Sequence, residues 1–322
     1  MVSTGTGDGR GLSLSIVVPV YRSAGTLPGL AERVRKEMLR IGLVDDFELI
    51  LVNDASPDES WAVIRGLSRD LPFVRGIHLR LNSGQHNALM AGLHFVRGRS
   101  VVLMDDDLQH PPEAIGDLLR ELGEEVDVCY ARYDHRADSR LKRLGSWFND
   151  AVATWLLGKP RGLYLSSFKA LKREIVAEVV KYDGPFVYLD GLILGVTHAI
   201  GTAPVHHHAR AAGTTNYSLS RLVSLWLRMA TTFSVRPLRV ATVAGLAISA
   251  ASLGMILVIL VEKLLRPDLP RGWASLIATT LFMGGVQMFS IGVIGEYLGR
   301  TYLKLNGKPQ FVVRATTWGR PS

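Results

Sequence analysis

The chain has 322 residues, of which 48% are hydrophobic, and it carries a net charge of +8 with a pI of about 9.7. That length allows one large domain or two smaller ones, and the hydrophobic share exceeds what a fully soluble surface requires. The single cysteine, Cys129, excludes a disulfide within the chain and is expected to be a buried thiol. A basic nucleic-acid binder fits the pI, but no recognition motif for nucleic acid is present. The positive charge fits an anionic lipid surface instead.

Short β-rich runs alternate with helical patterns between Leu12 and about Ala203, which is typical of a mostly parallel sheet flanked by helices. The strands are expected at 14–21, 47–54, 74–80, 100–106 and 126–132. The helices are expected at 24–43, 57–71, 85–96 and 111–123. The first apolar run is short, contains Pro19 and lacks a basic leader, so we expect no signal peptide and a cytosolic N-terminal part.

Polar residues follow three of these strands at the edge where parallel sheets bind ligands. They are Pro19 to Tyr21, Asn53 with Asp54, and Asp105 to Asp107. Three adjacent carboxylates repel one another, and a solvated acidic loop is the plainer explanation for them. We favour a hard divalent cation, which takes oxygen ligands and keeps part of its shell for water and a substrate phosphate.

Neither G-x-G-x-x-G after the first strand nor G-x-x-x-x-G-K-[ST] occurs, so the sequence supports neither a dinucleotide Rossmann site nor a P-loop. The type of site that the sequence still allows is one in which strand-end residues and a metal ion hold a nucleotide. Gly84 stands just before an expected helix, where free backbone N–H groups could hold an anion. A lone glycine in that place is more often a plain turn.

Two uncharged runs, about 240–261 and 273–295, are each long enough to cross a bilayer as a helix. The short connector holds Pro267 and Pro270, so we expect a transmembrane hairpin over 237–298, with a buried core hairpin as the alternative. Positive charge around the outer ends favours cytoplasmic termini and a multi-pass protein of the cell's inner membrane.

The expected division of the chain follows from these patterns. Residues 1–11 form a flexible N-terminus, 12–216 the α/β domain, and 299–322 a cytosolic tail. Residues 217–236 place apolar side chains at helical spacing beside arginines, which indicates an amphipathic helix in the membrane interface. A helix packed in the core is the rival interpretation.

Several motifs, in their order and spacing, resemble a known family. The segments VVPVYRSAGTL, ILVNDASPDES, LNSGQHNALMAG and MDDDLQHPPE resemble the nucleotide-sugar domain of family 2 glycosyltransferases with the GT-A fold. The segments HHHARAAGTTNYSLSRL, FSVRPLRVATVAGL and IGEYLGRTYLKLNGKPQFVV extend the likeness over nearly the whole chain. They are similar to polyprenyl-phosphate glycosyltransferases, which include dolichol-phosphate mannose synthases, bactoprenol glucosyltransferases and undecaprenyl-phosphate formamido-arabinose transferases.

The resemblance implies a nucleotide-sugar site at the strand ends and before the third helix. Its residues are Pro19, Tyr21, Asp54, Asn82, Gly84, Asp105 and Asp106. The resemblance also assigns Asp107, Gln109 and Asp105 to a cofactor, Mg²⁺ or Mn²⁺. Asp106 fills the variable middle place of the D-x-D motif, and the cation neutralises the crowded charge.

Catalytic roles are implied for Asp105, Asp107, Arg132 and Arg210, with Arg132, Arg210 and His207 at the lipid phosphate. An arginine fork pairs two oxygens of a phosphate, although a lone arginine is usually a surface residue. No catalytic base is nominated, because a phosphate monoester is largely dianionic at neutral pH. Residues 206–208 are three histidines in a row, and neighbours on an extended chain cannot all ligate one ion.

The implied reaction transfers a sugar from a nucleotide sugar to polyprenyl phosphate of the undecaprenyl or decaprenyl type. It is an inverting direct displacement whose product serves cell-envelope glycan modification. Ser23 and Asn216 stand where the family often has an acidic residue and a lysine, so the donor sugar is not implied. A processive polysaccharide synthase would need a Q-x-x-R-W motif, which is absent, and a non-catalytic membrane scaffold would not need the intact D-x-D-x-Q. Analogy with relatives suggests a homo-oligomer, such as a tetramer.

Overall fold

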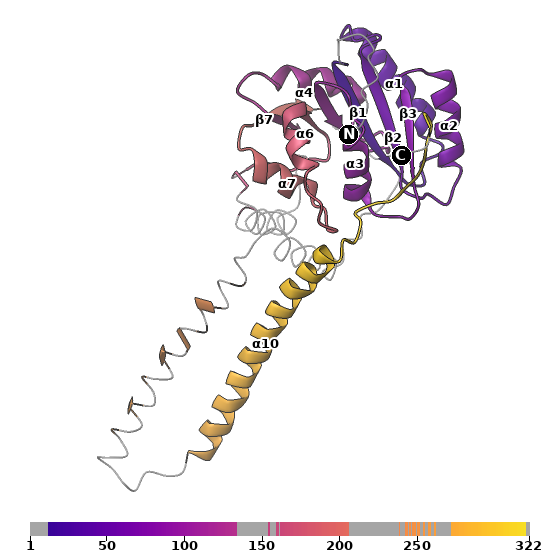
Figure 1. The fold of residues 1–322 in the computed structure, drawn as a ribbon. Helices are drawn as coiled ribbons and strands as arrows, with labels where there is room; N and C mark the ends of the chain where they lie inside the picture. Colours follow the sequence, from indigo (N-terminus) through magenta and orange to yellow (C-terminus); the bar gives the residue numbers. More distant parts are fainter. Residues whose placement is uncertain are drawn as a thin grey trace. The chain divides into compact units, whose positions relative to one another are not determined.

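The computed structural model describes residues 12–133, 162–205 and 272–319, with isolated positions between 154 and 160 and between 238 and 261. The chain divides into two compact units. The first comprises 1–151, 159–216 and 307–322, and the second comprises 152–158 and 217–306. The first unit contains the sheet and its flanking helices, and the second contains the long helix α10 (Trp273–Leu305) (Figure 1).

An eight-stranded sheet forms the centre of the first unit, in the order β7-β5-β6-β4-β1-β2-β3-β8. The strands are β1 (Leu14–Val20), β2 (Phe47–Asn53), β3 (Val74–Leu79), β4 (Ser100–Leu103), β5 (Val128–Tyr133), β6 (Lys169–Lys172), β7 (Ile200–Val205) and β8 (Val313–Thr316). The pairs β1–β2, β1–β4, β2–β3 and β5–β7 are parallel. β6 pairs antiparallel with β4 and β5, and β8 pairs antiparallel with β3. The expected α/β domain with a mostly parallel sheet is confirmed.

Helices pack on both faces of the sheet. They are α1 (Leu27–Arg40), α2 (Ser60–Asp70), α3 (Gln85–Leu93), α4 (Ile115–Glu121), α6 (Arg173–Val179) and α7 (Leu189–Val196). Alternating residues of β1 show the division: Ile16 and Val18 belong to the core cluster with α1, α2 and α4, whereas Val17 belongs to the cluster with α3, α6 and α7. Because both faces are covered, the central strands are nearly continuous hydrophobic runs.

The five strands and four helices expected from the sequence are all present, with ends that differ by a few residues. The expected helix 111–123 consists of a 3-10 turn, η1 (Pro112–Ala114), followed by α4. Cys129 is a free, fully buried thiol in β5, as predicted, and burial raises its pKa to about 12. The strands β6, β7 and β8 and the helices α6 and α7 were not expected.

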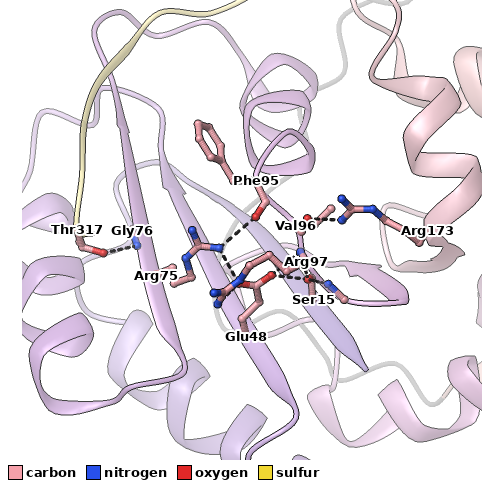
Figure 2. A network of polar contacts seen from close by, with 10 residues as sticks. Ser15, Glu48, Arg75, Gly76, Phe95, Val96, Arg97, Arg173 and Thr317 are labelled. Carbon is pink, nitrogen blue, oxygen red and sulfur yellow. Dashed lines mark hydrogen bonds and ion pairs between the residues drawn. The ribbon is translucent and has the colours of Figure 1, made fainter. Parts of the chain in front are cut away.

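The C-terminal segment differs from the tail expected over 299–322. Residues 313–316 form β8 on the edge strand β3, and residues 307–322 belong to the same compact unit as the sheet. The Gly76 N–H donates to Oγ1 of Thr317 at 3.0 Å (Figure 2). The ring of Trp318 lies 3.8 Å from the guanidinium of Arg75. This segment therefore covers an edge that would otherwise present free backbone groups.

The expected membrane segments lie in the second unit and in residues that the structure does not describe. Helix α10 covers the expected span at 273–295. The expected interfacial helix at 217–236, half of the positions of the expected span at 240–261, and the N-terminus 1–11 lie outside the described residues. Within the described part of the chain, no helix combines the length and the apolarity needed to cross a membrane. The hairpin stays a prediction.

Candidate active site

The loops that follow the central strands meet at one edge of the sheet, where hydrogen bonds join them. The Tyr21 N–H, after β1, donates to Oδ2 of Asp106, after β4, at 3.2 Å. The two oxygens of Asp54, after β2, accept the N–H groups of Ser83 and Gly84, after β3, at 2.7 and 2.8 Å. The predicted convergence of the strand-end polar residues is therefore confirmed.

Strained backbone collects at the same edge. Among the described residues, the non-glycine residues with a positive φ are Arg22 (58°), Ala55 (48°) and Leu108 (59°). They follow β1, β2 and β4, respectively. This left-handed conformation costs an ordinary residue about 1–2 kcal/mol. Strain of this kind persists where the surrounding structure holds it, and it is typical of binding and catalytic sites.

The residues predicted to bind the nucleotide sugar differ in their access to solvent. Asp54 is buried, and its carboxylate holds the loop before α3, where Gly84 adopts φ of 86°, a conformation that favours glycine. Tyr21 and Asn82 are exposed at the open edge. Pro19 is buried in β1, one residue before the strand ends, and it pairs with Val52.

Asp105 is held from two sides. Nε2 of Gln85, the first residue of α3, donates to Oδ1 of Asp105 at 2.6 Å. Oγ of Ser167, two residues before β6, donates to Oδ2 at 2.8 Å. The sequence analysis missed Ser167, because it belongs to no motif. The antiparallel register of β4 and β6, in which Leu103 faces Lys169, brings it to Asp105.

Asp106 contacts the β1 loop rather than solvent alone. Its carboxylate accepts the Tyr21 N–H, and the Ser23 side chain lies close enough to lower its pKa. Burial raises the pKa of the Asp106 carboxyl above its ordinary value, and the neighbouring charge of Asp105 adds to the rise. The Ser23 hydroxyl donates to the Tyr21 carbonyl at 3.2 Å, within the same loop.

Asp107 and Gln109 complete the loop that is expected to bind a metal ion. Asp107 is exposed, and its Oδ1 accepts the Gln109 N–H at 3.1 Å. Nε2 of Gln109 is buried without a hydrogen-bond partner among the described residues. The same residues contain no cluster of three or more His, Cys, Asp or Glu side chains arranged to hold a metal ion. The oxygen donors present fit Mg²⁺ or Mn²⁺ bound by one or two carboxylates together with substrate phosphates.

Of the residues predicted at the phosphates, one is described. Arg132 is the exposed penultimate residue of β5, next to Pro204 of β7. β5 runs parallel to β4, since each pairs antiparallel with β6, so Arg132 lies at the same edge as the Asp105 loop. Arg210 and His207 lie outside the described residues.

A buried ion pair below this edge was also missed. Nζ of Lys169 contacts Oδ1 of Asp190 closely, and the Tyr130 hydroxyl donates to the same oxygen at 3.0 Å. Lys169 and Asp190 are 2% and 6% exposed, so each charge needs the other. Burial lowers the pKa of the nearby His86; the charge of Asp190 opposes this effect, and the charge of Lys169 adds to it.

Comparison with known proteins agrees with the motifs. The family model for glycosyl transferase family 2 matches residues 15–180, and the model for the GtrB C-terminal hairpin matches residues 236–301. The SfII prophage-derived bactoprenol glucosyl transferase of Shigella flexneri is 30% identical over 96% of this chain and 100% of its own length. An undecaprenyl-phosphate 4-deoxy-4-formamido-L-arabinose transferase of Pseudomonas aeruginosa is 32% identical over 96% of this chain and 93% of its own. The chain belongs to glycosyl transferase family 2.

Proposed function

We propose that this protein transfers a sugar from a nucleotide sugar to polyprenyl phosphate. One observation carries the proposal: a chain whose strand-end carboxylates gather at one edge matches, over 96% of its length, relatives named for bactoprenol and undecaprenyl phosphate. The acceptor would be of the undecaprenyl or decaprenyl type. The product would be a polyprenyl-phosphate monosaccharide for cell-envelope glycan modification.

The chain's own residues can divide the work of an inverting direct displacement. Asp54 and the loop through Gly84 would hold the nucleoside, with Tyr21 at the open edge. Arg132 and Arg210 would pair with phosphate oxygens, because a guanidinium binds two oxygens at once. The acceptor phosphate, with a second pKa of about 6, is already a strong anion at neutral pH, so no side chain needs to remove its proton.

Asp107, Asp105 and Gln109 would hold Mg²⁺ or Mn²⁺ at the D-x-D loop. Such a cation would supply stabilisation of the charge on the departing diphosphate. The exposure of Asp107 supports this role, since it leaves the carboxylate free to bind a ligand that arrives with the donor. Among the described residues, no lysine or arginine forms an ion pair with the three aspartates of this loop.

We also propose that residues 237–298 form a transmembrane hairpin in the cell's inner membrane, with the catalytic domain and both termini in the cytoplasm. The match of residues 236–301 to a family model described as a C-terminal hairpin supports this arrangement. The helix expected at 217–236 would bring the site to the lipid phosphate, and a homo-oligomer is a further proposal. Release of the full-length chain from membranes by carbonate would contradict the hairpin.

The function is tested by incubating purified protein with polyprenyl phosphate, Mg²⁺ or Mn²⁺ and a panel of nucleotide sugars. Mass spectrometry of the lipid fraction should detect a polyprenyl-phosphate monosaccharide with at least one donor. Growth of a polymer on the lipid would support a processive synthase instead. A lipid fraction unchanged with every donor would support the non-catalytic scaffold.

A further inference from the structure

A closed ring of hydrogen bonds surrounds Asp105 and reaches into the core. The Asp105 N–H donates to Nδ1 of His110 at 3.0 Å. Oγ of Ser167 lies 2.8 Å from Oδ2 of Asp105 and 3.4 Å from Nε2 of His110. The three residues come from the loop after β4 and from the segment before β6, which pair only in the folded sheet.

The directions of these hydrogen bonds follow from chemistry. Nδ1 of His110 faces an N–H group, so it must accept, and a neutral imidazole then carries its proton on Nε2. An ionised carboxylate only accepts, so the Ser167 hydroxyl donates to Asp105 and its oxygen accepts from Nε2. Each residue thus donates once and accepts once.

Packing fixes the plane of the imidazole. The His110 ring stacks on Phe168 at 5.3 Å and 13°, and on Tyr133 at 6.3 Å and 15°. Its side chain is 9% exposed. The ring of hydrogen bonds is therefore anchored by aromatic side chains of the core and not by solvent.

The same contacts close the D-x-D loop. The hydrogen bond from the Asp105 N–H to the His110 ring joins the two ends of the loop 105–110, which presents Asp106 and Asp107. Within it Leu108 has a φ of 59° and the Asp107 carboxylate accepts the Gln109 N–H. A loop held in this strained form needs a tether, and His110 provides it.

We propose that His110 and Ser167 are positioning residues, which fix the Asp105 carboxylate and the loop through Gln109 for binding of the nucleotide diphosphate and its metal ion. This inference rests on the proposed function. Neither residue touches the substrate, and both act through Asp105. The alternative is that the ring stabilises the fold and has no effect on binding.

Four substitutions separate these roles. Ser167→Ala removes the donor to Oδ2, and Ser167→Thr keeps a hydroxyl in that place. His110→Phe keeps the aromatic stack but removes both nitrogens, and His110→Asn keeps an acceptor for the Asp105 N–H. Matched controls are Ser68→Ala, in α2, and His94→Phe, at the end of α3 beside Phe311.

The direct measurement is equilibrium binding of Mn²⁺ with UDP, GDP, CDP or dTDP by calorimetry, using whichever nucleotide binds the full-length protein most tightly. We expect Ser167→Ala and His110→Phe to weaken binding about 10-fold, as for the loss of a charge-assisted hydrogen bond. Ser167→Thr and His110→Asn should recover binding to within about 3-fold of the unsubstituted protein. The two controls should bind as the unsubstituted protein does.

Wild-type affinity in Ser167→Ala and His110→Phe would overturn the proposal. So would a loss of affinity that follows the unfolding temperature and that Ser167→Thr and His110→Asn do not recover. A protein that binds a nucleotide, shows the expected contrast and yet transfers no sugar would refute the proposed function and leave the positioning role standing. Binding of none of the four nucleotides would refute both.

Discussion

Glu48, which is buried, and Asp106, which is half-buried, are two carboxylates at opposite ends of the same sheet. Glu48 lies at the amino-terminal end of β2, where it accepts hydrogen bonds from the Ser15 hydroxyl and the Arg75 and Arg97 side chains (Figure 2). Asp106 follows β4 at the carboxyl-terminal end, where its partners are neutral groups of the β1 loop. Among the described residues, two arginines form ion pairs with Glu48 and none forms one with Asp106.

The two pKa values move in opposite directions for this reason. Burial alone raises the pKa of Glu48, but hydrogen bonds from Ser15, Arg75 and Arg97 outweigh burial and hold it below its ordinary value. Burial raises the pKa of Asp106, and the charge of Asp105 raises it further. Charge at the amino-terminal end is thus already matched within the fold. Under the proposed function, the charge at the carboxyl-terminal end would be met by the metal ion that binds with the donor.

The largest expected effect concerns Asp107. Asp107→Asn removes a carboxylate that the fold does not use for packing, so turnover should fall at least about 100-fold while the unfolding temperature stays unchanged. Asp45→Asn, at an exposed position before β2, is the matched control. Steady-state rates at saturating Mn²⁺ measure the effect. Turnover within threefold of the unsubstituted protein would contradict the role of Asp107 as a ligand of the metal ion.

Arg132 sharpens the comparison, because it is an exposed cation at the carboxyl-terminal edge. Arg132→Lys keeps the charge but loses the fork, and we expect a loss of turnover of about 10-fold, with a larger loss for Arg132→Ala. Arg210→Ala should behave in the same way. Arg314, exposed in β8, is the control. If Arg132→Ala and Arg210→Ala turned over as fast as Arg314→Ala, the two arginines would be ordinary surface residues and not phosphate ligands.

At the amino-terminal end of the sheet, Glu48→Gln should lower the stability of the fold and leave turnover unchanged. The substitution leaves Arg75 and Arg97 without their shared carboxylate, and the free energy of unfolding should fall by about 1–3 kcal/mol. Turnover per folded molecule should not change. Chemical denaturation measures the loss, with Glu125→Gln, at an exposed position, as control. A loss of turnover with unchanged stability would reverse the roles assigned to the two ends.

The pH dependence of that loss follows from the lowered pKa of Glu48. A carboxyl whose pKa is lowered by folding stabilises the protein fully above its ordinary pKa of 4.5, and the contribution disappears as pH falls through the lower folded value. The difference in unfolding free energy between the native protein and Glu48→Gln should therefore be constant from pH 7 to about 5 and shrink at lower pH. A difference that grows below pH 4.5 would contradict the assignment.

The central strands and helices were predictable because their patterns are local. β1 to β5 are apolar runs that end in polar residues, and α1 to α4 follow them with helical spacing. β6 and β8 are four residues long and carry no distinct pattern, so only their antiparallel pairing with β4 and β3 defines them. The C-terminal strand was expected to be a tail for that reason.

The site was predictable to the extent that motifs record it. Asp54 and Asp105 to Asp107 stand in motifs at strand ends, and the structure brings them to one edge. Ser167 and the Lys169–Asp190 pair depend on the register of β4 with β6 and on the placement of α7, which no local pattern encodes. Long-range pairing, and not residue type, decides which polar groups meet.

The central claim is that the two ends of the sheet have different tasks, and one paired measurement tests it most directly. Asp105→Asn and Glu48→Gln each replace a carboxylate by its amide, and turnover and unfolding free energy can be measured in the same preparations. We predict that Asp105→Asn loses turnover about 100-fold with little loss of stability, and that Glu48→Gln loses stability with little loss of turnover. If both variants lost turnover only in proportion to their loss of stability, the division between a reactive end and a structural end would be contradicted.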